Sequence, residues 1–463
     1  MINVRRLTVM TFLGASMLSG ISAQVSPLQV DTLKETKIPD QWDLQSCIDY
    51  AKEQNITIRK NRITAASTQI DVKTAKAAMF PSLSFSTGQQ VVNRPYQETS
   101  SRVSGSEIIS SNSKTSYNGN YGLNASWTLY NGNKRLKTIQ QEKLNNQMAE
   151  LDVATSENNI QESITQVYIQ ILYAAESVKV NENTLQVSIA QRDRGQELLN
   201  AGSIAKSDLA QLEAQVSTDR YQLVTAQATL EDYKLQLKQL LELDGENEMN
   251  IYLPTLSDEN VLAPLPTKRD VYISALSLRP EIEASKLNVE ASELGINIAK
   301  SSYFPTISLS AGIGTNHTSG SDFTFGEQVK NGWNNSIGLS ISVPIFNNRQ
   351  TKSAVQKAKL QYETSMLSLL DEQKALYKTI ESLWLDANSA QQRYAAANEK
   401  LKSTQISYEL ISEQFNLGMK NTVELLTEKN NLLQAQQEQL QAKYMAILNT
   451  QLLKFYQGDQ LAI

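Results

Sequence analysis

Two long proline-free stretches of the chain, about residues 134–243 and 349–456, repeat apolar residues at helical spacing. In the last part of each stretch, the apolar positions are seven residues apart: Leu209, Val216, Leu223, Leu230 and Leu237, then Leu426, Leu433, Leu440 and Ile447. A seven-residue repeat is typical of a coiled-coil seam. The other positions are mostly Gln, Glu, Lys and Thr, so we expect helices with a narrow apolar stripe and a broad surface in water.

A glycine interrupts each stretch once, at Gly202 and at Gly418. These glycines are 216 residues apart, and so are Tyr130 and Phe346, which lie just before the two stretches. We therefore expect a duplicated unit built on a long helical hairpin, with the two glycines at the hairpin tips. At about 1.5 Å per residue, the arm before Gly202 makes a rod of about 100 Å.

Alternation of apolar and small or polar residues predicts four β-strands in two pairs, at about 82–87, 120–129, 307–314 and 337–345. Strands of a membrane β-barrel show this alternation, and so do half-buried strands of a soluble sheet. Its recurrence at matching places in both halves favours the barrel. We expect the polar loops 93–118 and 316–335 to be extracellular.

Two strand pairs cannot close a barrel, and open sheet edges do not survive in lipid. The barrel must therefore be shared between copies of the chain. Three copies would give about twelve strands, although the alternation by itself indicates only an oligomer.

The first 23 residues are expected to be a signal peptide. Arg5 and Arg6 precede an apolar run from Leu7 to Leu18, which is too short to span a bilayer, and small residues end at Ala23. No cysteine follows at that point, so no lipid anchor is expected, and no later stretch is apolar enough for a transmembrane helix.

The remaining pattern predicts shorter helices and a division into two repeats. One helix begins after Asp43, a suitable N-cap, and continues to about Ala78. Shorter helices follow at about 270–278 and from Pro280. We expect a first repeat at 24–253, a proline-bearing linker at 254–268, and a second repeat at 269–463, with its strands within 306–345.

Composition argues against catalysis and nucleic-acid binding. Removing the signal peptide leaves 41 basic against 48 acidic residues, because Arg5 and Arg6 are lost from 43. One cysteine, Cys47, and one histidine, His317, cannot form a zinc site or a catalytic triad. We expect no enzyme activity, cofactor or metal, with Cys47 packed on a helix face and His317 on a loop surface. Gly312 and Gly314 lack the third glycine of a nucleotide-binding loop.

Several motifs resemble the TolC family of outer-membrane efflux proteins, and the resemblance covers about Trp42 to Gln457. The opening helix carries the sequence WDLQSCIDYA from Trp42, with Asn55 after it. The second repeat carries ALSLRPEI at 275–282, and FPSLS at 80–84 is matched by FPTIS at 304–308. The two glycine turns resemble the family's turns as well.

The resemblance implies a mainly α protein with a membrane β-barrel, in which a trimer forms a twelve-stranded barrel on a periplasmic helical tunnel. It also implies a passive exit duct that works with a periplasmic adaptor and an inner-membrane pump. The cargo would be small toxic compounds, with type I protein secretion as the alternative. A soluble coiled-coil interaction protein would have to treat the four strands as an ordinary sheet. A metal-ion exporter has no cluster of Met, His and Cys to support it.

The same resemblance assigns candidate sites. Family members engage adaptors through the two turns, which here are Ala201, Gly202, Ser203, Leu417, Gly418 and Met419. Gate candidates are Asp208, Glu424, Lys420 and Phe415, with the two acids as rings of like charge in a trimer. Where the family has a second acid one turn after Glu424, this chain has Thr427. The acids could instead cap their helices or pair with Lys206 and Lys420. Tyr121 and Trp127 lie on the apolar strand face and are expected in a membrane girdle.

Overall fold

The computed structural model describes residues 39–96, 100–104, 107–111, 114–244, 249–254, 261–319, 321 and 323–461. The predicted signal peptide lies outside these residues. All the helices and strands belong to one unit that begins at Trp42. The helices are α2 (Leu44–Gln54), α3 (Ile56–Ala77), α4 (Lys134–Asn200), α5 (Lys206–Leu240), α6 (Lys268–Leu278), α7 (Pro280–Ser301), α8 (Phe325–Asn331), α9 (Gln350–Asn416) and α10 (Thr422–Gln457).

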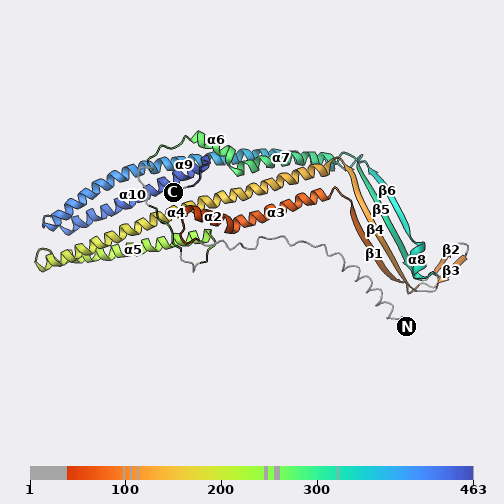
Figure 1. Cartoon of the computed structure of the whole chain (residues 1–463), viewed down its shortest axis with the longest axis horizontal. Coiled ribbons are helices and arrows are strands. Elements are labelled where there is room, and N and C mark those ends of the chain that lie inside the picture. The colour runs from red at the N-terminus through yellow and green to blue at the C-terminus, as the bar shows by residue number, and fades with distance from the viewer. Residues whose placement is uncertain are drawn as a thin grey trace. The chain divides into compact units, whose positions relative to one another are not determined.

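The predicted long hairpins are confirmed. Helices α4 and α9 have 67 residues each, and α5 and α10 fold back on them. The heptad positions face the seam, since Leu209, Val216 and Leu237 on α5 are buried, as is Leu433 on α10. Both turns lie at the same end of the helices, and the strands lie at the other end (Figure 1). Among the described helices, none contains a stretch that is both long and apolar enough to cross a bilayer.

The prediction of one continuous helix from Asp43 to Ala78 is wrong, because the helix breaks at Asn55. The Asp43 carboxylate caps α2 as predicted. The Asn55 side chain accepts hydrogen bonds from the backbone N–H groups of Thr57 and Ile58, and so begins α3. Its amide donates to the Leu240 carbonyl at the end of α5, 3.0 Å away. An asparagine that caps a helix and binds another helix end favours the break over a continuous helix.

The strands are β1 (Ser82–Asn93), β2 (Ser100–Ser104), β3 (Glu107–Ser111), β4 (Thr115–Asn131), β5 (Thr306–Thr318) and β6 (Asn334–Ser342). The predicted loop 93–118 is therefore wrong in part, because it contains β2 and β3 and the ends of longer strands. The predicted loop 316–335 contains α8. The fourth strand ends at Ser342, before the predicted end at Ile345.

A single antiparallel sheet joins both halves of the chain in the order β1-β4-β5-β6. Its register aligns apolar residues across strands: Phe85 opposite Leu123 and Ile313, and Trp127 opposite Leu309 and Leu339. The intervening rows align small and polar residues, such as Ser84 with Asn124, Gly312 and Ser336. The sheet therefore has one apolar and one polar face along its length.

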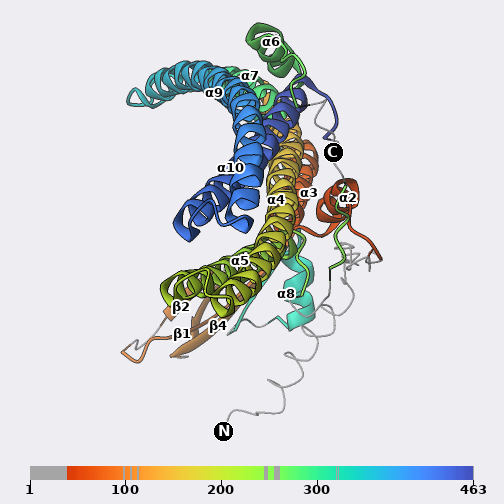
Figure 2. The ribbon, with the colours of Figure 1, turned by 90° about the vertical axis from the view of Figure 1, so that its left-hand side faces the viewer.

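The helices next to the sheet continue its order. Contacts join α3 to α4, α4 to α7 and α7 to α9. Each of these helices is joined in sequence to the strand that holds the same place in the row: α3 to β1, α4 to β4, α7 to β5 and α9 to β6. Toward the turns the order becomes α5-α4-α10-α9 (Figure 2). The chain is thus a single layer of rods that continues into a single layer of strands.

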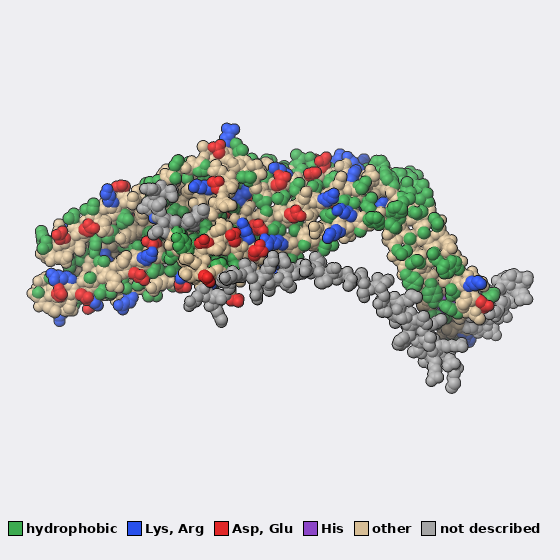
Figure 3. All heavy atoms as spheres, viewed as in Figure 1, with side chains coloured by type: hydrophobic (Ala, Val, Ile, Leu, Met, Phe, Trp, Pro, Cys, Tyr) green, Lys and Arg blue, Asp and Glu red, His purple; other side chains and the backbone are tan. Residues whose placement is uncertain are grey.

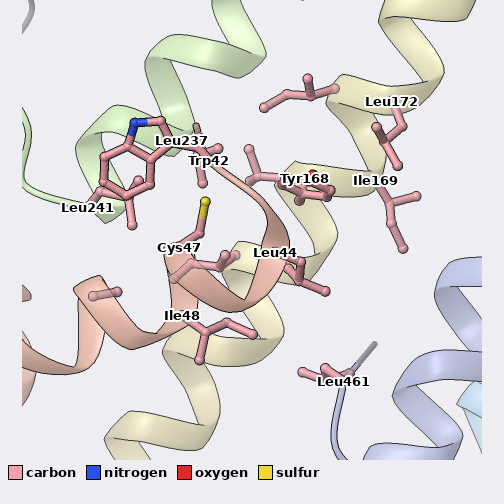
Figure 4. Packing of buried hydrophobic residues seen from close by; sticks show 14 of the residues in the cluster. Trp42, Leu44, Cys47, Ile48, Tyr168, Ile169, Leu172, Leu237, Leu241 and Leu461 are labelled. Atoms are coloured by element: carbon pink, nitrogen blue, oxygen red, sulfur yellow. The ribbon is translucent and has the colours of Figure 1, made fainter. Parts of the chain in front are cut away.

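The main core lies midway along the helices, around α2 (Figure 4). Trp42, Cys47 and Ile48 pack against Tyr168 and Leu237. Burial raises the pKa of the Cys47 thiol to about 12, which leaves it an inert packing group. The packing role expected for Cys47 is confirmed. Backbone bonds from Trp42 to residues 250 and 252 fasten the connection between the repeats to this core.

Arg279 of the RPEI sequence joins the second repeat to this region. Its buried guanidinium lies 3.6 Å from the ring centroid of Tyr456 and 4.8 Å from that of Phe455. It also donates to Glu162 on α4, 2.9 Å away. Burial raises the pKa of the Glu162 carboxyl. Arginine suits this place because its planar group stacks on rings while it binds a carboxylate.

A buried ion pair fixes the two hairpins to each other near the turns. Lys429 of α10 reaches Asp219 on α5 and Ser188 on α4, and all three side chains are almost fully buried. Gln215 donates to the second Asp219 oxygen, 2.9 Å away, and to Asn430 at 3.3 Å. Burial lowers the pKa of Lys429. Because the partners come from both hairpins, displacing one hairpin from the other at this level would expose or separate two buried charges.

We expect Lys429→Met to lower the free energy of unfolding by about 3–5 kcal/mol, because it leaves the Asp219 carboxylate buried without its cation. Adding Asp219→Leu should restore most of this loss, since two apolar groups need no charge partner. Thermal unfolding followed by circular dichroism in detergent measures both effects.

The matched control is Lys400→Met. Lys400 also joins two helices, through Glu438 at 2.7 Å, but this pair is exposed. An exposed pair contributes about 0–1 kcal/mol. Equal effects of the two lysine substitutions would show that the Lys429 pair gives the hairpins no special stability.

Candidate functional site at the hairpin turns and on the sheet

The two turns have the same backbone structure. Gly202 and Gly418 both have φ of 73°, a conformation that favours glycine. In each turn the glycine N–H binds the carbonyl three residues earlier, and the next N–H binds the carbonyl five residues earlier. Both turns are therefore closed by the hydrogen bonds of a helix C-cap rather than by side chains. A Cβ on either glycine would meet open space, so only φ requires glycine there.

The expected docking residues lie at the ends of the hairpins. Ala201, Gly202 and Ser203 are exposed, as are Leu417, Gly418 and Met419. The second turn is the more apolar, because the Leu417 and Met419 side chains are each 70% exposed. Large apolar side chains in water at a turn provide a surface for another protein.

Asp208 caps its helix in this structure. Its Oδ2 accepts a hydrogen bond from the Ala205 N–H, 3.0 Å away, at the first turn of α5. An ion pair between Asp208 and Lys206 is not found among the described residues. The capping alternative therefore holds for Asp208.

Glu424 both caps its helix and pairs with Lys420. Its Oε1 lies 2.6 Å from Lys420 Nζ, and its Oε2 accepts from the Asn421 N–H at 3.2 Å. Asn421 returns a cap to the Glu424 N–H. The hydrogen bond from Lys420 is the main cause that lowers the pKa of the Glu424 carboxyl, so the group is ionised at neutral pH. Lys420 thus partly neutralises the acid that it helps to position.

Phe415 is buried at the end of α9, whereas its neighbours in the turn are exposed. Farther from the turn, Gln191 of α4 donates to the Tyr408 hydroxyl of α9, 2.9 Å away. With the Lys429 pair, this bond connects the two hairpins within one chain. Sequence reasoning missed Lys429, Asp219 and Tyr408. Two charges that lie 210 residues apart carry no local signal of pairing.

The apolar sheet face is open in the single chain. Side chains such as Leu83, Phe85, Ile337 and Leu339 are largely exposed on it. Hydrophobic side chains gather over the strands, whereas acidic and basic groups are spread over the helices (Figure 3). The outer edges of β1 and β6 have no partner strand among the described residues.

Tyr121 and Trp127 lie on this apolar face at two levels. Trp127 is near the helices, where its indole N–H donates to the Met79 carbonyl, 2.8 Å away. Tyr121 is nearer the loops and stacks on His317. The prediction of a surface His317 is wrong. The residue lies in β5, is only 8% exposed, and is enclosed by rings because β5 extends farther than its short alternating pattern indicated.

The profile of the outer membrane efflux protein family matches residues 47–242 and 271–458. Outer membrane efflux protein BepC of Brucella suis is 23% identical over 299 residues, which cover 64% of this chain and 62% of BepC. Outer membrane protein TolC of Escherichia coli is 24% identical over 61% of this chain and 58% of TolC. The chain thus spans about six tenths of the length of these relatives.

The fold resembles that of the outer-membrane channel CusC. A crystal structure of CusC superposes with a TM-score of 0.76 over 90% of this chain and 92% of that chain, at 19% identity. At this identity the likeness establishes the fold, and the family match covers most of the two halves. The chain therefore belongs to the outer membrane efflux protein family, and it is an outer-membrane protein.

Proposed function

We propose that three copies of this chain form the exit duct of a tripartite efflux system. Small toxic compounds would pass through the duct from an inner-membrane pump, to which a periplasmic adaptor couples it. The observation that carries this proposal is the pair of open edges, which occur at the same sides of the strand row and of the helix row. A second copy can satisfy both pairs of edges at once.

The sheet supplies the first pair of edges, β1 and β6. Unpaired backbone N–H and C=O groups cannot remain at an edge in lipid. Pairing β1 of one copy with β6 of the next closes the sheet without a new fold. Three copies of the four-stranded sheet give about twelve strands, with the apolar face outward and the polar face around a water-filled pore.

The helix row supplies the second pair, α3 and α9. Ile56, Ile63 and Ile70 form an exposed stripe with seven-residue spacing on α3, and Leu360 and Leu367 form another on α9. Both stripes lie at the sides of the row that continue into β1 and β6. Packing α3 against α9 of the next copy buries both stripes and extends the duct below the barrel.

Tyr121 and Trp127 support the proposed membrane level. They are six residues apart on β4, about 20 Å along the strand at about 3.4 Å per residue. The lipid-facing band of such barrels is about 25 Å tall, with aromatic residues at both of its edges. We assign these two residues to the girdle.

The turns are the proposed docking points for the adaptor. In a closed ring the turns of all copies meet at the same end, so Leu417 and Met419 present a repeated apolar surface. Cargo class depends on the pump that shares the adaptor. Type I protein secretion is the alternative, and the pump that co-purifies with the native complex distinguishes the two.

A disulfide test addresses the assembly. Ile63 is 61% exposed on α3 and Leu367 is 67% exposed on α9, at similar distances from the sheet. We expect a chain carrying both Ile63→Cys and Leu367→Cys to form covalent dimers and trimers when membranes are oxidised, as seen on denaturing gels. A second pair, Ile70→Cys with Leu360→Cys, tests the next level.

Each single cysteine variant is the control, because one cysteine per chain cannot link three chains. The native Cys47 is buried, with a pKa of about 12, and should not react. If both double variants remain monomeric after complete oxidation, adjacent copies do not meet through α3 and α9.

A conductance test addresses the gate. Three Glu424 carboxylates around one axis would attract cations. We expect Glu424→Ala to raise the divalent-cation concentration for half-block of single channels on the order of fivefold, since a contact charge in water contributes about 1 kcal/mol.

Thr427→Ala is the matched control for this test, one turn farther along α10, and should leave the block unchanged. Because the pKa of Glu424 is lowered, the native block should persist as pH falls to the ordinary glutamate range and be lost only below it. An unchanged half-block concentration in Glu424→Ala would remove Glu424 from the gate.

A further inference from the structure

Helix α8 lies against the outer end of the apolar sheet face. The Thr315 hydroxyl of β5 donates to the Val329 carbonyl of α8, 2.7 Å away, and the Thr318 N–H donates to Gln328 Oε1 at 2.8 Å. Thr315 is paired with Tyr121 in the sheet, and both side chains belong to the apolar face. The segment that follows β5 therefore folds back over the side of the sheet that the proposed duct turns toward lipid.

Aromatic rings hold α8 in this position. His317 lies between Tyr117 and Tyr121 of β4, with ring centroids 5.1 and 5.9 Å away, and Phe325 of α8, at 5.0 Å. Neither ring nitrogen of His317 has a hydrogen-bond partner among the described residues. The imidazole thus contributes contact area rather than a polar bond, and it forms the floor on which α8 rests.

The other side of this segment presents aromatic residues to the surroundings. Phe323 is 53% exposed and Trp333 is 57% exposed, one on each side of α8. Its acidic residue, Glu327, is engaged in the cap with Thr324. Exposed aromatic side chains beside an apolar sheet face are typical of the boundary between lipid and water.

We propose that residues 323–333 form a membrane-interface anchor on the outside of the barrel. In this arrangement Phe323 and Trp333 enter the lipid–water boundary of the outer leaflet, and the ring contacts of His317 fix the anchor to β5. This proposal rests on the proposed barrel, because it requires the apolar face to meet lipid. The occupant is lipid because the anchor is continuous with that face and carries the same kind of side chain.

Gly326 offers a reporter position that leaves the aromatic residues intact. A Cβ at Gly326 meets nothing within 4 Å, and the residue is exposed. Gly326→Cys, labelled with a small fluorophore, is reconstituted as the full chain in phosphatidylcholine vesicles. Nitroxide lipids labelled near the headgroup or near the chain end then measure its depth. We expect quenching by the headgroup label to be about twofold stronger than quenching by the deep label.

Two further positions separate the anchor from the barrel. Leu339→Cys, on the apolar face of β6, should be quenched by the deep label if the barrel stands in lipid. Ser310→Cys, on the polar face, should not be quenched. Quenching at Leu339 with none at Gly326 overturns the anchor and leaves the barrel intact; the segment then meets water or another protein. If neither position is quenched, the barrel proposal fails and the anchor fails with it.

Substitutions in the labelled Gly326→Cys chain test the contacts themselves. We expect Trp333→Ala to reduce quenching by the headgroup label about twofold, because an interfacial ring is lost. His317→Phe should preserve the quenching, since a ring still supports α8, whereas His317→Ser should weaken it. If His317→Phe and His317→Ser behave alike, the ring contacts do not fix the anchor.

Discussion

The unpaired edges of one short sheet constrain everything else in this protein. Strands β1 and β6 end a four-stranded sheet whose apolar side is uncovered, and a bilayer provides no hydrogen bonds for free edges. The helix row ends in the same way, at α3 and α9, with exposed isoleucine and leucine stripes. Both problems are solved by the same neighbour on each side. The fold of a single chain is therefore one sector of a ring rather than a finished domain.

Rigid coupling of the two hairpins complements this design. The Lys429 ion pair and the Gln191–Tyr408 bond hold the hairpins together near their tips, and Arg279 holds the second repeat at mid-length. The turns themselves depend on glycine φ values and helix caps. A sector with fixed tips presents the same turn surfaces in every copy. A repeated docking surface requires this uniformity.

Long periodic elements were predictable from the sequence, and contacts between distant residues were not. The heptads, the glycine turns and the strand alternation each recur over many residues, so the hairpins and the apolar strand face were found. The break at Asn55 depends on a bond to Leu240, which no local pattern records. His317 and α8 were missed because two polar side chains and a short helix look like a loop in sequence. Capping by Asp208 and Glu424 was one of the alternatives left open, and the structure decides it.

Native mass spectrometry of the protein extracted from outer membranes in mild detergent tests the central claim most directly, because it counts the chains that close one duct. The account predicts an assembly of three mature chains that withstands mild heating, with no monomer in the water-soluble fraction. A stable water-soluble monomer, with its strands covered by its own residues, would contradict it.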